Sequence, residues 1–331
     1  MEGQREGRAL AGRTLITGGA GFIGSRLAAR LLAERQPVIL LDNFNDYYDP
    51  ARKRANIADL RAEFPDRPPL VVEADVRDRA ALSQLFVAEE IRRVAHLAGM
   101  AAVRYSVERA PLYAEVNTLG SVNVLECARQ HEVENFILAS TSSVYGNAAP
   151  PFREDQIPDR PLAPYPASKR AAELMAHATH ALFGLNVTIA RLFNVYGPAG
   201  RPDMMPLKVL DWLHEGRVIP MYDGGALRRD WTYIDDTVEA LFRALQQPLG
   251  YEILNLGFGA TRSFAEFVAI YEELTGIVAR KEHLPAPPSE PDTLWSDPTK
   301  ARRLLGWQPK TDLRTGLQAT WDWYRGAILS R

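Results

Sequence analysis

The sequence has 331 residues, of which 46% are hydrophobic and 24% charged, and its formal net charge at pH 7 is −2. This is the composition of a globular protein, without the basic excess of a nucleic-acid-binding protein or an apolar run long enough to cross a membrane. The single cysteine, Cys127, cannot form an intramolecular disulfide, so we expect a reducing, cytoplasmic setting. We expect residues 1–12 to form a flexible tail.

The first predicted elements are a strand, a glycine turn and a helix. In "RTLITGGAGFIGSRLAARLL" a short apolar strand is followed by glycines at 18, 21 and 24 and by apolar residues at helical spacing from Phe22 and Ile23 onward. Gly18 would make the tight turn, Gly21 would let a pyrophosphate approach the backbone, and Gly24 would let helix and strand pack closely. The free N–H groups of the helix start would bind the phosphates.

An acid ends the next strand. "VILLD" is a continuous apolar run that closes on Asp42, with Asn43 after it. A carboxylate there accepts hydrogen bonds from both ribose hydroxyls and repels a 2′-phosphate. Since no Arg or Lys directly follows Asp42, we expect the cofactor to be NAD rather than NADP.

Strands and helices then alternate. Further strands are predicted at 70–75, 93–98, 135–140 and 186–192, with helices at 80–89, 113–130 and 166–183 between them. This alternation predicts an α/β protein with a Rossmann-type doubly wound parallel sheet. The alternation breaks after Arg191. We therefore expect a Rossmann domain over 13–193 plus 234–257 and a smaller C-terminal substrate domain over 194–233 plus 258–331.

A tyrosine and a lysine lie one turn apart at the start of the helix 166–183. In "YPASK" the ammonium of Lys169, together with a bound nicotinamide ring, would favour the phenolate of Tyr165. Tyr165 could then take a proton from a substrate hydroxyl near neutral pH. Pro166 suits the first helical position.

The spacing G-x-x-G-x-x-G with Y-x-x-x-K downstream resembles the extended short-chain dehydrogenase/reductases, from about Arg13 to Gly316. The resemblance implies that Thr141 is the catalytic hydroxyl and that Ser142 and Ser143 line the same site. Relatives that dehydrate sugars carry Asp-Glu after the Thr, and relatives that decarboxylate carry Glu at the second position. The two serines therefore favour epimerisation, in which the hydride returns to the same carbon.

Four stretches resemble UDP-glucuronate 4-epimerases: "DNFNDYYDPARKRANIADL", "HLAGMAAVRYSVERAPLYAEVNTLGSVNVLE", "VYGPAGRPDMMPLK" and "GGALRRDWTYIDD". The resemblance implies that Arg201 holds the sugar carboxylate, that Arg229 binds the diphosphate, that Asp292 lies near the uridine ribose and that Arg104 contacts the substrate. It also implies further cofactor contacts from Asp75, Val76, Leu97, Ala98 and Asn117. It implies a homodimer through the helices around 113–130 and 166–183.

Two positions depart from this pattern and leave alternatives open. Asn194 is typical of UDP-galactose 4-epimerases, and Ser289 stands where many relatives have Arg or Gln. A neutral UDP-hexose therefore remains an alternative substrate, and a non-catalytic NAD-binding sensor is the alternative outside enzymes. No metal is expected, because His177 and His180 have no companion ligands. His96 is expected to be a core histidine near the cofactor rather than a base.

Overall fold

The computed structural model describes residues 12–287 and 291–330. Its centre is a seven-stranded sheet in which every neighbouring pair is parallel. In spatial order the strands are β11 (Tyr251–Leu256), β6 (Val187–Leu192), β5 (Asn135–Thr141), β4 (Ile91–His96), β1 (Arg13–Thr17), β2 (Val38–Asp42) and β3 (Leu70–Glu73). The chain order reverses between β1 and β4, and the carboxyl ends of strands beside such a reversal are where α/β sheets bind ligands. The predicted Rossmann-type fold is confirmed.

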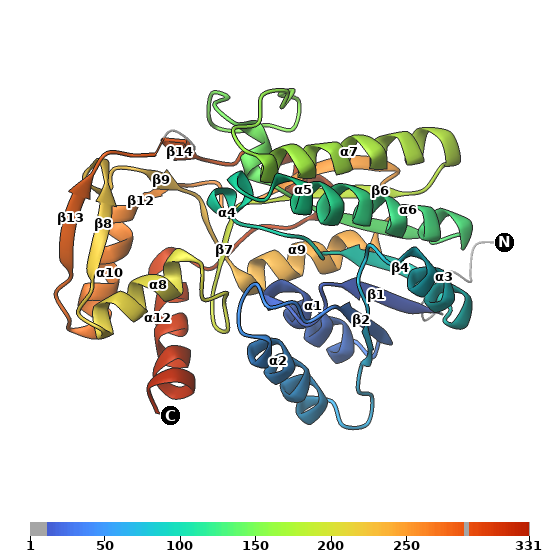
Figure 1. Ribbon diagram of the computed structural model, residues 1–331, viewed down its shortest axis with the longest axis horizontal. Helices are drawn as coiled ribbons and strands as arrows, with labels where there is room; N and C mark the ends of the chain where they lie inside the picture. Colours follow the sequence, from blue (N-terminus) through green and yellow to red (C-terminus); the bar gives the residue numbers. More distant parts are fainter. Residues whose placement is uncertain (1–11, 288–290, 331) are drawn as a thin grey trace.

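Helices cover both faces of this sheet (Figure 1). One layer contains α3 (Arg79–Ala88), α5 (Ala110–Tyr113), α6 (Gly120–Gln130) and α7 (Pro164–Phe183). The other contains α1 (Phe22–Ala33), α2 (Pro50–Glu63), α9 (Ile234–Gln246) and α11 (Thr299–Leu305). Since both faces of the sheet are buried, β2 is apolar along its length until it ends at Asp42, as the run "VILLD" indicates.

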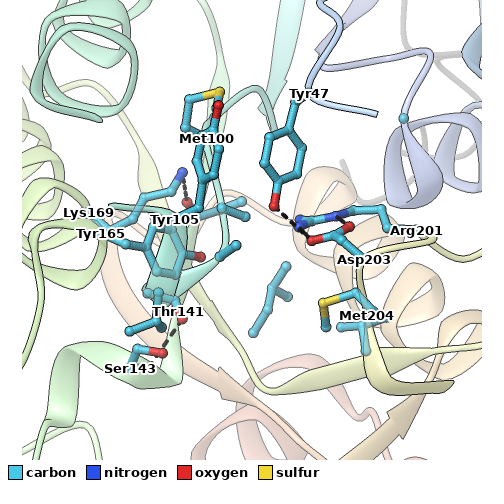
Figure 2. Close-up of a pocket in the computed structure, with 18 of the residues that line it drawn as sticks. Tyr47, Met100, Tyr105, Thr141, Ser143, Tyr165, Lys169, Arg201, Asp203 and Met204 are labelled. Carbon is cyan, nitrogen blue, oxygen red and sulfur yellow. Dashed lines mark hydrogen bonds and ion pairs between the residues drawn. The ribbon is translucent and has the colours of Figure 1, made fainter. Parts of the chain in front are cut away.

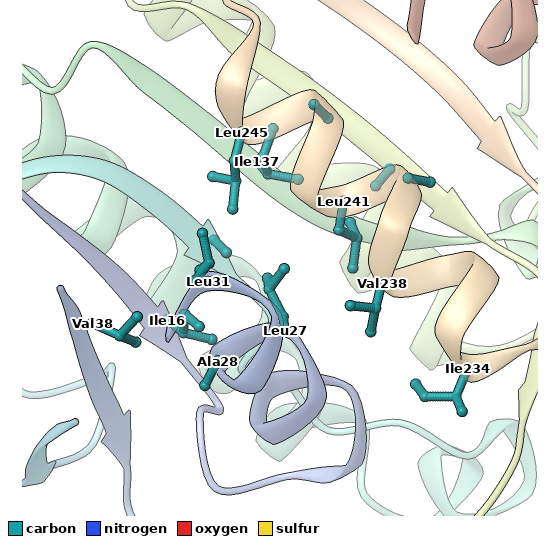
Figure 3. Packing of buried hydrophobic residues seen from close by; sticks show 14 of the residues in the cluster. Ile16, Leu27, Ala28, Leu31, Val38, Ile137, Ile234, Val238, Leu241 and Leu245 are labelled. Atoms are coloured by element: carbon teal, nitrogen blue, oxygen red, sulfur yellow. The ribbon is translucent and has the colours of Figure 1, made fainter. Parts of the chain in front are cut away.

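The core between α1, α9 and the sheet shows why these segments are helical (Figure 3). Leu27 and Leu31 on α1 are four residues apart, and Leu241 and Leu245 on α9 repeat that spacing, so each helix presents one apolar face to the strands. Burying such side chains contributes about 1.5–3 kcal/mol each relative to exposure.

The remaining elements form a second region beside the carboxyl ends of the strands (Figure 1). They include β7 (Asn194–Tyr196), α8 (Met205–His214), β8 (Val218–Tyr222), β9 (Arg228–Arg229), β10 (Trp231–Tyr233), β12 (Arg262–Ser263), α10 (Phe264–Thr275), β13 (Arg280–Leu284), β14 (Thr293–Leu294) and α12 (Leu313–Tyr324). They share an apolar core that contains Leu210, Phe267 and Leu317. A capping box of Ser263 and Glu266 is present at the start of α10.

Several boundaries differ from the sequence-based expectation. Helix α7 begins at Pro164, so Pro166 is the third helical residue, still within the first turn, where N–H groups lack intrahelical partners. The helix expected over 113–130 is interrupted by a π-helical turn, η1 (Ala114–Leu119). Trp307, just beyond α11, packs in the core under the sheet although its segment was assigned to the substrate domain. The domain division itself stays a prediction, and the tail 1–12 and Ser289 lie almost wholly outside the described residues.

The described residues contain neither a membrane-spanning helix nor a cluster of metal ligands. No helix within 12–287 and 291–330 has both the length and the apolar character needed to span a membrane. Across the same residues, no three His, Cys, Asp or Glu side chains come together as a metal site would require.

Candidate active site

A cavity of about 1020 Å³ lies at the carboxyl ends of the strands, between the sheet and the second region. Of the predicted site residues, the following line it: Gly18, Gly21, Phe22, Ile23, Gly24, Asp42, Asn43, Asp75, Val76, Leu97, Ala98, Arg104, Thr141, Ser142, Ser143, Tyr165, Lys169, Asn194, Arg201 and Arg229. Asn117 and Asp292 are not in its wall as the structure describes it. Residues from strand ends, loops and helix starts far apart in the sequence are thus brought to one space.

The glycine turn leaves no room for larger residues. Gly18 has a φ of +67°, and a Cβ there would lie 2.8 Å from the backbone N of Ala98. A Cβ on Gly24 would lie 2.3 Å from the carbonyl oxygen of Gly18. Gly21 caps α1 without any side-chain hydrogen bond, and the first residues of the helix line the cavity, so the N–H groups of that turn have no side-chain partner at the N-cap. The turn therefore has the shape that a diphosphate needs.

Asp42 is held by more partners than the sequence indicated. Its carboxylate is 5% exposed and accepts the N–H groups of Phe44, at 2.9 Å, and Ala20, at 3.3 Å. Lys53, also buried, donates to Asp42 from 3.1 Å. A cation therefore lies beside Asp42 although no Arg or Lys directly follows Asp42 in the sequence, and its charge is paired with the Asp42 carboxylate.

Lys53 reaches Asp42 because α2 begins at Pro50. The carboxylate of Asp49 accepts the N–H of Ala51, and Pro50 occupies the first helical position, which together place Lys53 on the first turn of the helix beside β2. The "DP" start signal in the sequence could have revealed this helix.

Asn43 and Asp75 join the ends of β2 and β3. The amide of Asn43 donates to Asp75 at 2.8 Å, and Arg77 donates to the same carboxylate from its backbone and its guanidinium. The hydrogen bonds from Arg77 lower the pKa of Asp75 to about 2, against the effect of burial. Asp75 is therefore ionised at neutral pH.

Asn117 lies behind the cavity wall rather than in it. Its Oδ1 accepts the N–H of Met100 at 2.8 Å, and its Nδ2 donates to the carbonyl of Met100 and to Ser168 Oγ, both at 2.9 Å. The amide thus fastens the loop after β4 to helix α7, with its hydrogen-bonding capacity used inside the protein. It supports Leu97 and Ala98, which do face the cavity.

His96 is a core histidine, as expected. It is fully buried, with Nδ1 2.6 Å from Thr17 Oγ1 and Nε2 2.9 Å from Ser121 Oγ. Burial, and then the charge of Lys169, lower the pKa of His96 to about 3. It is neutral at any physiological pH and has no free nitrogen for proton transfer.

Tyr165, Thr141 and Ser143 meet at one end of the cavity (Figure 2). Thr141 ends β5, and its Oγ1 accepts the N–H of Ser143 at 3.2 Å. Burial raises the pKa of Tyr165, and a hydrogen bond with Thr141 and the charge of Arg201 lower it only in part. That Lys169 and a bound nicotinamide ring favour the phenolate stays a prediction. The protein by itself keeps Tyr165 a phenol at neutral pH.

Lys169 lies one helical turn beyond Tyr165 and is 5% exposed. Its Nζ donates to the carbonyl oxygen of Ala139, on β5, at 3.0 Å. Burial lowers the pKa of Lys169 to about 8, and the carboxylate of Glu173 opposes that shift. Lys169 is therefore an ammonium below about pH 8.

Glu173 continues the same helical stripe and was not predicted. It is fully buried and accepts two hydrogen bonds from Arg191, at 3.0 and 2.8 Å, and one from Ser140, at 2.5 Å. Arg170 donates a fourth at 2.9 Å. The cluster ties α7 to β5 and β6 and so fixes the separation of Tyr165 from the end of β5.

Arg201 stands on the wall across the cavity from Tyr165 (Figure 2). It follows β7 in a loop and is half-buried. Its guanidinium makes two hydrogen bonds to Asp203, and their pairing raises its pKa despite burial. The structure thus brings a permanent cation to the site, as predicted, already paired with a carboxylate of this chain.

The other residues predicted to bind the substrate differ in their exposure and in their contacts. Arg229 is 8% exposed and donates to the carbonyl oxygens of Arg228 and Asp292, at 2.9 and 3.3 Å. Arg104 reaches Tyr222 on β8, with its Nη1 3.3 Å from the hydroxyl. Asn194 begins β7 at the cavity wall. The side chain of Asp292 is exposed, so its role stays a prediction that the described contacts do not support.

These residues fit a dinucleotide. The glycine turn is a cradle that a Cβ at position 18 or 24 would fill, and a buried acid ends the next strand. Oxidised NAD, when bound, supplies a hydride acceptor and a positively charged ring.

Comparison with known proteins agrees with this geometry. The sequence profile of the GDP-mannose 4,6-dehydratase family matches residues 15–320. UDP-glucuronate 4-epimerase from Thermodesulfobacterium geofontis is 39% identical over 318 residues, which cover 96% of this chain and 97% of that protein.

Two solved structures are also similar. UDP-glucuronic acid 4-epimerase from Bacillus cereus, in complex with UDP-glucuronic acid and NAD, has a TM-score of 0.89 and 32% identity, covering 95% of this chain and 99% of that one. UDP-glucose 4-epimerase from Thermotoga maritima, with UDP-glucose, has a TM-score of 0.86 and 29% identity, covering 96% and 99%. The chain belongs to the GDP-mannose 4,6-dehydratase family of extended short-chain dehydrogenase/reductases.

Proposed function

We propose that this protein is an NAD-dependent isomerase that interconverts UDP-glucuronate and UDP-galacturonate by epimerisation at C4. The observation that carries the proposal is Arg201, a cation in the cavity wall across from Tyr165, where the carboxylate of a uronic acid could be held. The similarity to UDP-glucuronate 4-epimerases supports it.

In the proposed reaction, Tyr165 acts as the phenolate that the positive charges of Lys169 and a bound nicotinamide ring would favour. It accepts the proton of the C4 hydroxyl while the hydrogen on C4 leaves as hydride to the acceptor that oxidised NAD would supply. Thr141 hydrogen-bonds with Tyr165 and is placed to hold the same sugar oxygen. The 4-keto sugar then rotates within the site, so that the hydride returns to the opposite face of C4. Tyr165 gives the proton back to the C4 oxygen. Lys169 keeps a positive charge beside this site below about pH 8.

Arg201 has a further task with a uronic acid. The 4-keto intermediate is a β-keto acid, which loses CO₂ easily when the bond to the carboxylate is perpendicular to the carbonyl plane. A guanidinium can hold a carboxylate by two parallel hydrogen bonds and so fix its direction. Ser142 and Ser143 supply hydroxyls but no carboxylic acid for dehydration or decarboxylation.

A neutral UDP-hexose is the second candidate substrate. Asn194 lies at the cavity wall, where its amide is available for a diphosphate or a hydroxyl, and the fold also resembles a UDP-glucose 4-epimerase. Arg201→Ala separates the two candidates. It should cripple turnover of UDP-glucuronate but barely change turnover of UDP-galactose. Arg153→Ala, which removes an exposed arginine with the same Arg-x-Asp pairing, is the control.

The proposal is tested by incubating purified protein with UDP-glucuronate deuterated at C4. We expect UDP-galacturonate, without added cofactor if NAD copurifies, and retention of the deuterium. Formation of UDP-xylose as the main product, or no turnover, contradicts it. Tyr165→Phe should abolish turnover and leave NAD affinity unchanged. In a non-catalytic NAD sensor, the loss of that hydroxyl would have no effect on function.

We further propose a cytoplasmic homodimer formed through α6 and α7. Support comes from Leu174, Met175 and Leu182 on α7, which are 54%, 43% and 74% exposed and spaced as one helical stripe. The cytoplasmic setting rests on Cys127, a buried free thiol. Light scattering of the purified protein measures the oligomeric state, and a monomer would contradict the dimer.

A further inference from the structure

The guanidinium of Arg201 is held along one edge by a carboxylate of its own loop. Nε donates to Asp203 Oδ1 at 3.0 Å, and Nη2 donates to Asp203 Oδ2 at 2.6 Å. A guanidinium has five N–H groups in a fixed planar arrangement. Because Asp203 uses Nε and Nη2, the donors that remain for a substrate lie toward Nη1.

Tyr47 holds the same carboxylate from a separate segment of the chain. Its hydroxyl donates to Asp203 Oδ2 at 2.9 Å, and its ring lies 5.6 Å from the guanidinium carbon of Arg201 (Figure 2). The ring of Tyr47 in turn packs edge-on against Tyr105, with 5.0 Å between the ring centroids. Tyr47, itself held by Tyr105, thus helps to fix the orientation of Asp203 and through it that of Arg201.

The segment that carries Tyr47 starts at the predicted cofactor acid. Asn43 Oδ1 accepts the N–H of Asn45 at 3.1 Å, and Asn45 Oδ1 accepts the N–H of Tyr47 at 3.3 Å. In the segment from Asp42 to Tyr47, two successive turns of the backbone are therefore each held by an asparagine side chain. Tyr47 therefore joins the cofactor half of the cavity to the loop that carries Arg201 and Asp203.

We propose that Asp203 and Tyr47 are positioning residues that fix which edge of Arg201 meets the sugar carboxylate, and so suppress loss of CO₂ during epimerisation. This rests on the proposed function. Neither residue was a predicted site residue, and neither needs to touch the reacting carbon. Their effect is on the direction of the bond between C5 and the carboxylate carbon.

The reaction that they suppress balances without another reactant. In the 4-keto acid the C5–C6 bond breaks, and its electron pair passes to the C4 carbonyl as an enolate. CO₂ leaves, and a proton adds at C5 to give a 4-keto pentose. This requires the breaking bond to lie across the carbonyl plane, so a guanidinium that can rotate permits it and a fixed one hinders it.

The experiment measures the partition between UDP-galacturonate and CO₂-loss products in the holoenzyme given UDP-glucuronate. A ratio of products is independent of how much of the preparation is folded. Asp203→Asn keeps the shape but turns one oxygen into an N–H donor that faces the donors of Arg201. We expect the share of CO₂-loss products to rise about tenfold, which corresponds to about 1.4 kcal/mol in the relative barriers. Tyr47→Phe should change it in the same direction by less.

A matched pair elsewhere in the chain supplies the control. Arg153 and Asp155 have the same spacing, with hydrogen bonds of 3.1 and 2.6 Å, but both are exposed and lie outside the cavity wall. Asp155→Asn should leave the partition at the wild-type value. If Asp203→Asn does not fold, Tyr47→Phe, which keeps the carboxylate, decides the question.

If the partition is unchanged in Asp203→Asn, the positioning proposal is overturned. The same result in Tyr47→Phe overturns it where only that variant folds. In either case, turnover by the wild-type protein leaves the proposed function standing. An equal rise in Asp155→Asn also overturns the positioning proposal. If wild-type protein does not convert UDP-glucuronate at all, the proposed function fails first and the positioning role fails with it. The wild-type assay thus distinguishes the two failures.

Discussion

Replacing Glu173 by Gln should destabilise the protein strongly, because it leaves Arg191 without its counter-charge in the core. Glu173 is fully buried and Arg191 is 1% exposed, and two hydrogen bonds join them. A glutamine can accept from one N–H of Arg191, but its amide nitrogen then faces the other donor. Removing one partner of a buried ion pair costs about 3–5 kcal/mol.

That loss can be measured by heat and by urea. An unfolding entropy of about 2.1 cal/mol/K per residue gives about 0.7 kcal/mol/K for this chain, so the midpoint should fall by about 4–7 °C. Urea unfolding at pH 7 should show a lower midpoint with an unchanged slope. Glu173→Gln combined with Arg191→Met should be no less stable than Glu173→Gln alone, since the second change removes the orphaned charge.

The chain contains a control with the same local geometry. Arg129 donates to Glu126 from Nε and Nη2, at 2.7 and 2.6 Å, but these side chains are 28% and 26% exposed. Glu126→Gln should change stability little, because solvent screens the pair and already solvates its members. The reasoning from burial is refuted if Glu126→Gln lowers the free energy of unfolding as much as Glu173→Gln does, or if Glu173→Gln is as stable as the wild-type protein.

Two further predictions concern the cofactor turn and the lysine. Gly24→Ala places a Cβ 2.3 Å from the carbonyl oxygen of Gly18, so NAD affinity should fall by at least about tenfold in fluorescence titration, while Gly326→Ala, which meets nothing, should not change it. The kcat/KM should fall as pH rises through about 8, where Lys169 loses its proton, and Lys169→Arg should shift that fall upward. The pKa of Lys169 is about 8 in the folded protein and lies below its usual 10.5, so between these two pH values the unfolded chain binds the proton more tightly than the folded protein does. The contribution of Lys169 to the free energy of unfolding therefore increases with pH in this range. A flat pH profile up to pH 9 would contradict the assignment.

Local patterns in the sequence predicted the parallel sheet and the cofactor turn. Gly18, Gly21 and Gly24 directly follow a strand, and their role depends on backbone geometry within eight residues of one another. The same holds for Tyr165 and Lys169, which one helical turn places together. The sequence also indicated that Arg201 belongs to the site, through the stretch in which it lies.

Contacts between distant segments could not be predicted in this way. Lys53 reaches Asp42 only because α2 packs beside β2, and the pKa of Tyr165 depends on how deeply α7 is buried. Asp203 is two residues from Arg201, yet its partner Tyr47 lies 156 residues away in sequence.

The sequence by itself determined the parallel sheet and predicted the residues that we propose for the chemistry, because strand–turn–helix geometry and helical spacing are short-range properties of the chain. Only the tertiary structure decided the charge states and orientations of those residues. Burial and hydrogen-bond partners set them, and both arise when segments far apart in sequence pack against one another.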